Sequence, residues 1–157
     1  MKIGVPKEIK PQENRIGLTP ESVKTLVSNG HEVMVESNGG FEAGFYNDQY
    51  KIAGAKIIEK PEDIFNNSEI IVKVKEPLPQ EVKMIRENQI VFTYLHLAAA
   101  KELTQGLMNS KSICIAYETV TDNNGRLPLL APMSAVAGRM SVQAGAHCLE
   151  KNQKGRG

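Results

Sequence analysis

Short apolar runs and longer amphipathic stretches alternate along this chain. The apolar runs are rich in β-branched and aromatic residues, as strands are, and occupy residues 2–5, 31–36, 55–58, 70–75, 89–94 and 112–117. The stretches between them predict helices, and the clearest begins at Thr19, whose hydroxyl can cap a helix with Pro20 in its first turn. Strands that alternate with helices indicate an α/β fold with a doubly wound, mainly parallel sheet of the flavodoxin or Rossmann-like type.

The last part of the chain has a different pattern. Residues 132–153 predict one long helix that begins at Pro132 and is rich in small residues: Ala135, Ala137, Gly138, Ser141, Ala144, Gly145 and Ala146. Small side chains allow other backbones to approach closely, which suits a helix packed between two bodies. We therefore expect one domain at residues 1–128 and, at residues 129–157, a connecting helix that leads into a further domain absent from this chain.

Composition narrows the possible functions. With 157 residues, 41% of them hydrophobic and 24% charged, the chain can form one domain with a real core. Its 19 basic and 18 acidic residues nearly balance and form no basic block, so we expect no nucleic-acid partner. No apolar run approaches the roughly 18–20 residues of a membrane span, and the N-terminus lacks the apolar core of a signal peptide. Cys114 and Cys148 have no metal-site spacing and suit small core residues of a reduced, cytoplasmic protein without a metal.

Two predicted strands end beside residues that can carry chemistry. Lys75 ends the run at 70–75, and His96 follows the run at 89–94 almost directly. Parallel strands point the same way, so both residues should emerge at the carboxyl edge of the sheet, where open α/β sheets bind ligands. Arg15, in the loop after the first strand, should reach the same edge.

These residue types suit a small anionic metabolite and acid–base chemistry. Arginine offers a carboxylate a planar fork, lysine offers a point charge, and histidine titrates near neutrality. Each residue also has an ordinary explanation, as a loop cation, a solvated strand end and a hydrogen-bonded buried histidine respectively. The other two histidines lack this position: we expect His31 at the surface and His147 packed in the long helix.

Five segments carry a family resemblance. They read MKIGVPKEIKPQENRIGLTPESV, IVKVKEP, FTYLHLA, AYETV and PLLAPMSAVAGRMSVQAGA. In order and spacing they resemble the N-terminal part of the L-alanine dehydrogenase family, which shares its N-terminal domain with NAD(P) transhydrogenases. The resemblance covers essentially the whole chain.

The resemblance implies a reversible oxidative deamination of L-alanine to pyruvate and ammonia, with NAD as the hydride acceptor. On matching positions it implies that Arg15 and Lys75 bind the substrate and that His96 is the general acid/base. It further implies that Ser134 touches the nicotinamide cofactor and that Met133 lines the same cleft. The resemblance also implies a homo-oligomer, namely a hexamer in the full-length family.

The family's second domain is a dinucleotide-binding domain with a glycine-rich phosphate turn. These 157 residues contain no G-x-G-x-x-G, so we expect the chain alone to be inactive. Two alternatives stay open: a transhydrogenase-like domain, and a non-catalytic remnant that binds a metabolite or acts in assembly. Lys75 and His96 favour the dehydrogenase, because transhydrogenases generally lack this pair as it stands in KVKEP and YLHLA.

Overall fold

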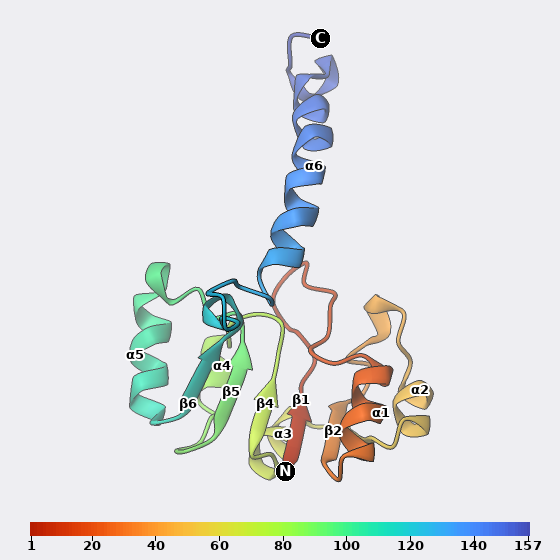
Figure 1. The fold of residues 1–157 in the computed structure, drawn as a ribbon, viewed down its shortest axis with the longest axis vertical. Coiled ribbons are helices and arrows are strands. Elements are labelled where there is room, and N and C mark those ends of the chain that lie inside the picture. The colour runs from red at the N-terminus through yellow and green to blue at the C-terminus, as the bar shows by residue number, and fades with distance from the viewer. The chain divides into compact units, whose positions relative to one another are not determined.

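The computed structural model describes all residues from Met1 to Gly157. The chain divides into two compact units, Met1–Ala116 and Tyr117–Gly157, and each is described here by itself (Figure 1). The domain boundary predicted between residues 128 and 129 stays a prediction.

The first unit is built on a six-stranded sheet in which every neighbouring pair is parallel. The strand order is β3-β2-β1-β4-β5-β6. The strands are β1 (Lys2–Val5), β2 (Glu32–Glu36), β3 (Lys56–Ile58), β4 (Ile70–Val72), β5 (Ile90–Thr93) and β6 (Ile113–Ala116). The chain builds outward from β1 to β3 and then returns to place β4 on the other side of β1, so a topological switch point lies between β1 and β4.

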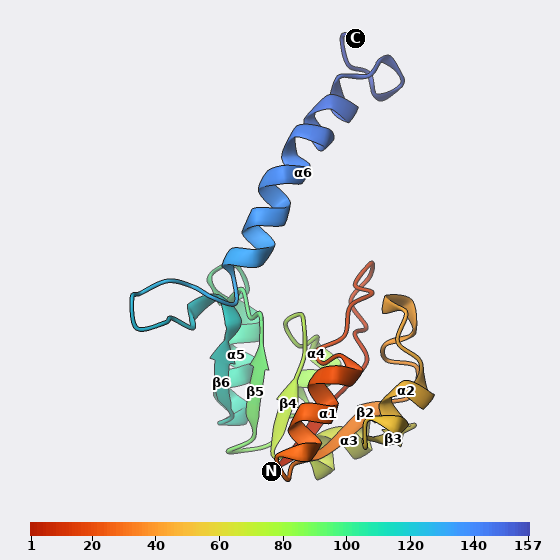
Figure 2. The same cartoon turned by 45° about the vertical axis from the view of Figure 1, so that its right-hand side comes forward.

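Five α-helices belong to this unit and cover both faces of the sheet (Figures 1 and 2). They are α1 (Pro20–Ser28), α2 (Asn47–Ile52), α3 (Pro61–Asn67), α4 (Pro79–Val82) and α5 (Lys101–Ser110), with short 3-10 turns at Phe41–Ala43 and Leu97–Ala99. Figure 2 shows α1 in front of the sheet and α5 behind it.

Two separate cores explain this layering. Side chains alternate between the faces of a strand, so neighbouring residues of β4 enter different cores. Val72 packs with residues of β1, β2, α1 and α2, whereas Ile71 packs with residues of α3, α5 and β5. The doubly wound α/β fold predicted from the sequence is therefore confirmed.

Some predicted boundaries were wrong. The run at 70–75 was expected to be strand throughout, but β4 ends at Val72, because the Val74 amide donates to the Glu8 carboxylate instead of to a neighbouring strand. The N-cap of α2 is Tyr46, whose amide donates to Gln49 Oε1 at 2.7 Å.

The second unit contains one long helix, α6 (Ala131–Leu149), between the 3-10 turns Tyr117–Thr119 and Lys151–Gln153. The predicted start at Pro132 is confirmed to within one residue. His147 and Cys148 are exposed. The expectations that His147 packs in the long helix and that Cys148 is a core residue were therefore wrong for this chain. No helix of the structure has the length and hydropathy needed to cross a membrane.

Candidate functional site

Lys75 and His96 each lie three residues beyond the end of a strand, and the two strands are neighbours. In the parallel register of β4 and β5, Val72 is paired with Phe92. Beyond the strands, the Tyr94 amide donates to the Val74 carbonyl at 3.3 Å. The Thr93 hydroxyl donates to the Lys75 carbonyl at 2.9 Å. The two segments are thus joined at the carboxyl edge of the sheet, as predicted from the sequence.

The backbone that carries Lys75 is held by a buried carboxylate. Glu8 Oε1 accepts hydrogen bonds from the amides of Val74 at 2.6 Å and Lys75 at 3.3 Å. Its other oxygen lies 3.2 Å from the Nζ atom of Lys73, which also lies 2.7 Å from Glu81 Oε1. All three charged side chains are almost fully buried, so the ammonium and the two carboxylates must satisfy one another. This cluster was not predicted from the sequence, in which its only signal is a lysine within an apolar run.

The loop that carries Arg15 passes directly against the end of β4. A Cβ atom added at Gly17 would lie 2.6 Å from the Val72 carbonyl oxygen, so only glycine allows the two backbones to approach this closely. Arg15 is consequently brought to the same end of the sheet as Lys75.

The guanidinium of Arg15 is held by a carboxylate from its own loop. Arg15 Nε donates to Glu13 Oε1 at 2.7 Å, and Nη2 donates to Oε2 at 2.6 Å. The hydrogen bonds from Arg15, with a smaller effect of the Lys75 charge, hold the pKa of Glu13 below its ordinary value despite partial burial. The hydrogen bonds to Glu13 in turn raise the pKa of Arg15. The guanidinium of Arg15 thus already holds a carboxylate, which is the chemical group that it is predicted to bind in a substrate.

His96 has a constrained backbone and contacts Tyr94 and Glu76. It adopts a left-handed conformation, with φ 50° and ψ 38°, which is uncommon for a residue other than glycine. Its ring stacks on Tyr94, with the centroids 6.1 Å apart. Its Nδ1 atom lies 3.4 Å from Glu76 Oε2, and the other oxygen of Glu76 forms an ion pair with Lys10. The imidazole side chain is half exposed, so the explanation as a buried histidine does not apply.

Glu76 is expected to carry a full negative charge at neutral pH. Burial raises the pKa of its carboxyl, but the hydrogen bond and charge of Lys10, with a contribution from His96, outweigh that effect and bring the pKa below its ordinary value. Glu13 and Glu76 were both missed by the sequence analysis, because they are loop carboxylates among 18 acidic residues with no distinguishing pattern.

Ser134 and Met133 belong to the second unit, in the first turn of α6. The Ser134 hydroxyl donates to the Leu130 carbonyl at 3.4 Å, a bond within the helix itself. Their predicted contact with the cofactor stays a prediction. No group of three or more histidine, cysteine, aspartate or glutamate side chains is arranged to hold a metal ion.

Known proteins resemble this chain over its whole length. The family model for the alanine dehydrogenase/PNT N-terminal domain matches residues 4–137. The alanine dehydrogenases of Halomonas elongata and Bacillus subtilis are each 53% identical over 157 residues, which are 100% of this chain but 42% and 41% of those relatives. The chain thus spans less than half the length of the relatives that it matches.

Solved structures of the same two kinds of enzyme also resemble this chain. An L-alanine dehydrogenase has a TM-score of 0.92 and 55% identity, with 100% of this chain and 43% of that chain covered. A transhydrogenase from Sinorhizobium meliloti has a TM-score of 0.70 and 26% identity, with 75% of this chain and 35% of that chain covered. The family predicted from the sequence is confirmed: this chain belongs to the alanine dehydrogenase/PNT N-terminal domain family.

Proposed function

We propose that this chain is the substrate-binding part of an L-alanine dehydrogenase, which catalyses the reversible, NAD-dependent oxidative deamination of L-alanine to pyruvate and ammonia. The observation that carries the proposal is that the segments of Lys75 and His96 are joined at one sheet edge, which the loop of Arg15 also reaches. Identity of 55% to an L-alanine dehydrogenase, against 26% to a transhydrogenase, supports the dehydrogenase.

The roles follow from the chemistry of each group. Arg15 binds the substrate carboxylate through its planar fork, which requires that carboxylate to replace the one of Glu13. Lys75 is a compact cation on a backbone fixed by Glu8, and it binds the carbonyl or imine end. His96 transfers the proton, as a half-exposed imidazole can.

The cofactor would meet this chain only at its nicotinamide end. Ser134 brings a hydroxyl and Met133 an apolar side chain to the first turn of α6, and these suit the amide and ring of a nicotinamide. The chain has no glycine-rich turn for a pyrophosphate. When bound, NAD supplies the hydride acceptor, and the proposed work of this chain is to bind and orient the substrate and move its proton.

Assembly and location complete the proposal. The protein is a homo-oligomer, a hexamer as the family resemblance implies, with no nucleic-acid or membrane partner. It works in the cytoplasm, in keeping with two cysteines that are both free.

A chimaera tests the proposed activity. Residues 1–157 would replace the matching 41% of the Bacillus subtilis enzyme. The chimaera should reduce NAD with L-alanine and oxidise NADH with pyruvate and ammonia, both followed by NADH absorbance. A folded chimaera that shows neither reaction, while the parent enzyme is active in the same assay, would contradict the proposal.

A further inference from the structure

One buried carboxylate oxygen near the candidate site lacks a well-formed hydrogen bond. Glu76 Oε2 is inaccessible to solvent and has no partner in good geometry. Buried polar atoms are nearly always hydrogen-bonded, so such an oxygen requires an explanation. The titratable nitrogen that it faces is His96 Nδ1, at 3.4 Å, which is longer than an ordinary hydrogen bond. Hydrogen bonds of this kind are often long without substrate and shorten when it binds.

Both partners of this contact are held from elsewhere. The other oxygen of Glu76 is held by the ammonium of Lys10, which comes from the loop after β1. Glu76 also follows Lys75, whose amide is held by Glu8. On the imidazole side, the left-handed backbone of His96 and the stacking on Tyr94 restrict the ring. The carboxylate therefore presents Oε2 to one ring nitrogen in particular.

We propose that Glu76 is a positioning residue that holds the neutral imidazole of His96 in the Nδ1–H tautomer. An ionised carboxylate can only accept hydrogen bonds, so the nitrogen that faces it must carry the proton. The tautomer of a histidine is set by the partner of the nitrogen that does not react. Nε2 is then the atom with the lone pair.

The consequence for proton transfer rests on the proposed function of this site. Nε2 takes the proton from the substrate or from water, and the ring becomes an imidazolium whose Nδ1–H still faces Glu76. The charge formed on the ring is balanced by the charge of the carboxylate. In the reverse reaction the same proton leaves Nε2, and Glu76 neither gains nor loses one.

The chain offers a matched comparison. His147 Nδ1 also lies 3.4 Å from a carboxylate oxygen, Glu150 Oε2. In that pair both side chains are more than half exposed, so water competes for both groups and the contact fixes little. In the His96 pair the glutamate side chain is only 17% exposed. The same distance should therefore fix the tautomer at His96 but not at His147.

The test is nitrogen NMR of the 157-residue chain labelled with ¹⁵N-histidine, recorded on the alkaline plateau of each titration. The chain has three histidines and should therefore show three sets of ring-nitrogen signals. The variants His31→Gln and His147→Gln would assign each set to its residue. His96 should show a protonated Nδ1 and a bare Nε2. His147 should show the Nε2–H form that predominates in a free imidazole.

Glu76→Gln should reverse the tautomer of His96. Lys10 can only donate, so it would keep the amide oxygen of the new glutamine and leave the NH₂ group facing His96 Nδ1. Nδ1 must then accept, and the proton must move to Nε2. The matched variant Glu150→Gln should leave the spectrum of His96 unchanged and alter that of His147 little.

Two outcomes would overturn the inference: an Nε2–H tautomer of His96 in the unmodified chain, or an Nδ1–H tautomer that survives Glu76→Gln. The first outcome is measured on the unmodified chain, so it can be observed even if the Glu76→Gln variant fails to fold. In the active chimaera, Glu76→Gln should lower kcat by roughly 10²–10⁴-fold, the span for a proton-transfer group or its wrong tautomer, with the KM for NADH nearly unchanged. The tautomer measurement needs no activity, so failure of this inference is distinct from failure of the proposed function.

Discussion

Lys73→Met keeps the length of a fully buried side chain but removes the charge between the carboxylates of Glu8 and Glu81. Both carboxylates would stay buried, held only by backbone amides such as those of Val74 and Leu78. Breaking a buried ion pair by removing one partner costs about 3–5 kcal/mol. We expect that loss in the free energy of unfolding of the chain.

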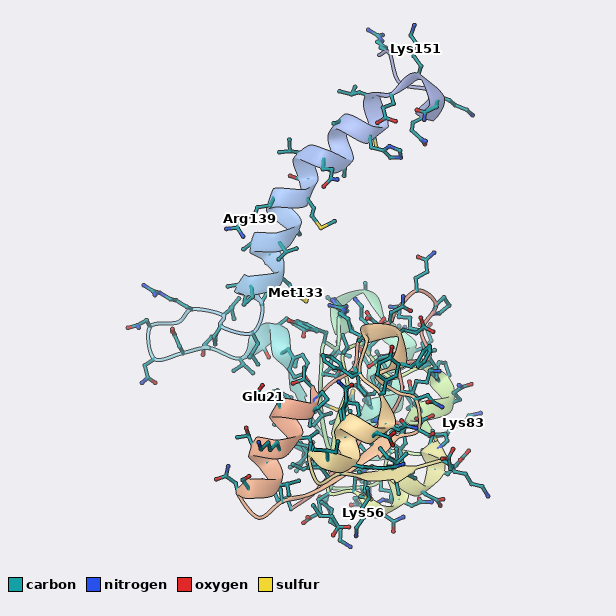
Figure 3. The ribbon with its side chains drawn as sticks, turned by 90° about the vertical axis from the view of Figure 1, so that its right-hand side faces the viewer. Glu21, Lys56, Lys83, Met133, Arg139 and Lys151 are labelled. Atoms are coloured by element: carbon teal, nitrogen blue, oxygen red, sulfur yellow. The ribbon has the colours of Figure 1, made fainter.

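Urea unfolding followed by circular dichroism would measure the loss, since the chain has no tryptophan. With a slope of about 2 kcal/mol per molar urea, the midpoint should fall by about 1.5–2.5 M. Lys83→Met is the matched control, because Lys83 is an exposed surface side chain (Figure 3). That change should stay within about 0.5 kcal/mol.

A combined variant separates charge from packing. Glu8→Gln and Glu81→Gln added to Lys73→Met would remove all three charges but keep oxygen acceptors for the amides of Val74 and Leu78. Stability should recover by more than half, because no uncompensated charge then remains buried. Lys73 does not stabilise the buried carboxylates if Lys73→Met costs no more than Lys83→Met, or if the combined variant is less stable than Lys73→Met alone.

Three further predictions concern binding and pH. Arg15→Lys keeps the charge but loses the planar fork, so in the chimaera it should weaken pyruvate binding by about 1.5–3 kcal/mol. This corresponds to a rise of about 10- to 150-fold in the KM for pyruvate, and an unchanged KM would mean that Arg15 does not bind the substrate. Burial raises the pKa of Tyr50 to about 12, so the unfolded chain ionises first and stability should fall from about pH 10 to about 12, a slope that Tyr50→Phe should reduce. The 157-residue chain should not bind NADH appreciably in calorimetry, and micromolar binding would contradict the cofactor assignment.

Much of the fold could be predicted because the apolar runs are short, β-branched and separated by helical patterns. The ends of the elements could not. β4 stops at Val72 because the Val74 amide bonds to Glu8, a residue 66 positions away, and local sequence contains no trace of that bond. The second core, with α3 and α5 on the opposite face, follows once the strands are parallel and joined by helices.

The site residues that could be predicted from the sequence are those that directly follow a predicted strand. Lys75 and His96 were found because each follows a strand, and parallel strands deliver their ends to one edge. The carboxylates that hold Lys75, Arg15 and His96 are those of Glu8, Glu13 and Glu76 respectively. They come from loops and acquire their roles only through contacts made in three dimensions. The role of Arg15 was predicted from its place in the loop after the first strand and from the family resemblance, and Gly17 is the structural reason that its loop reaches β4.

The central claim is that His96 transfers a proton to and from the substrate. The most direct test is turnover of the chimaera with His96→Ala, compared with its Tm in the same preparation and with His31→Ala as control. We predict that kcat falls by roughly 10²–10⁴-fold while the Tm stays close to that of the unmodified chimaera, because the imidazole is half exposed. A lowered Tm with activity per folded molecule retained would contradict the claim and make His96 a structural residue.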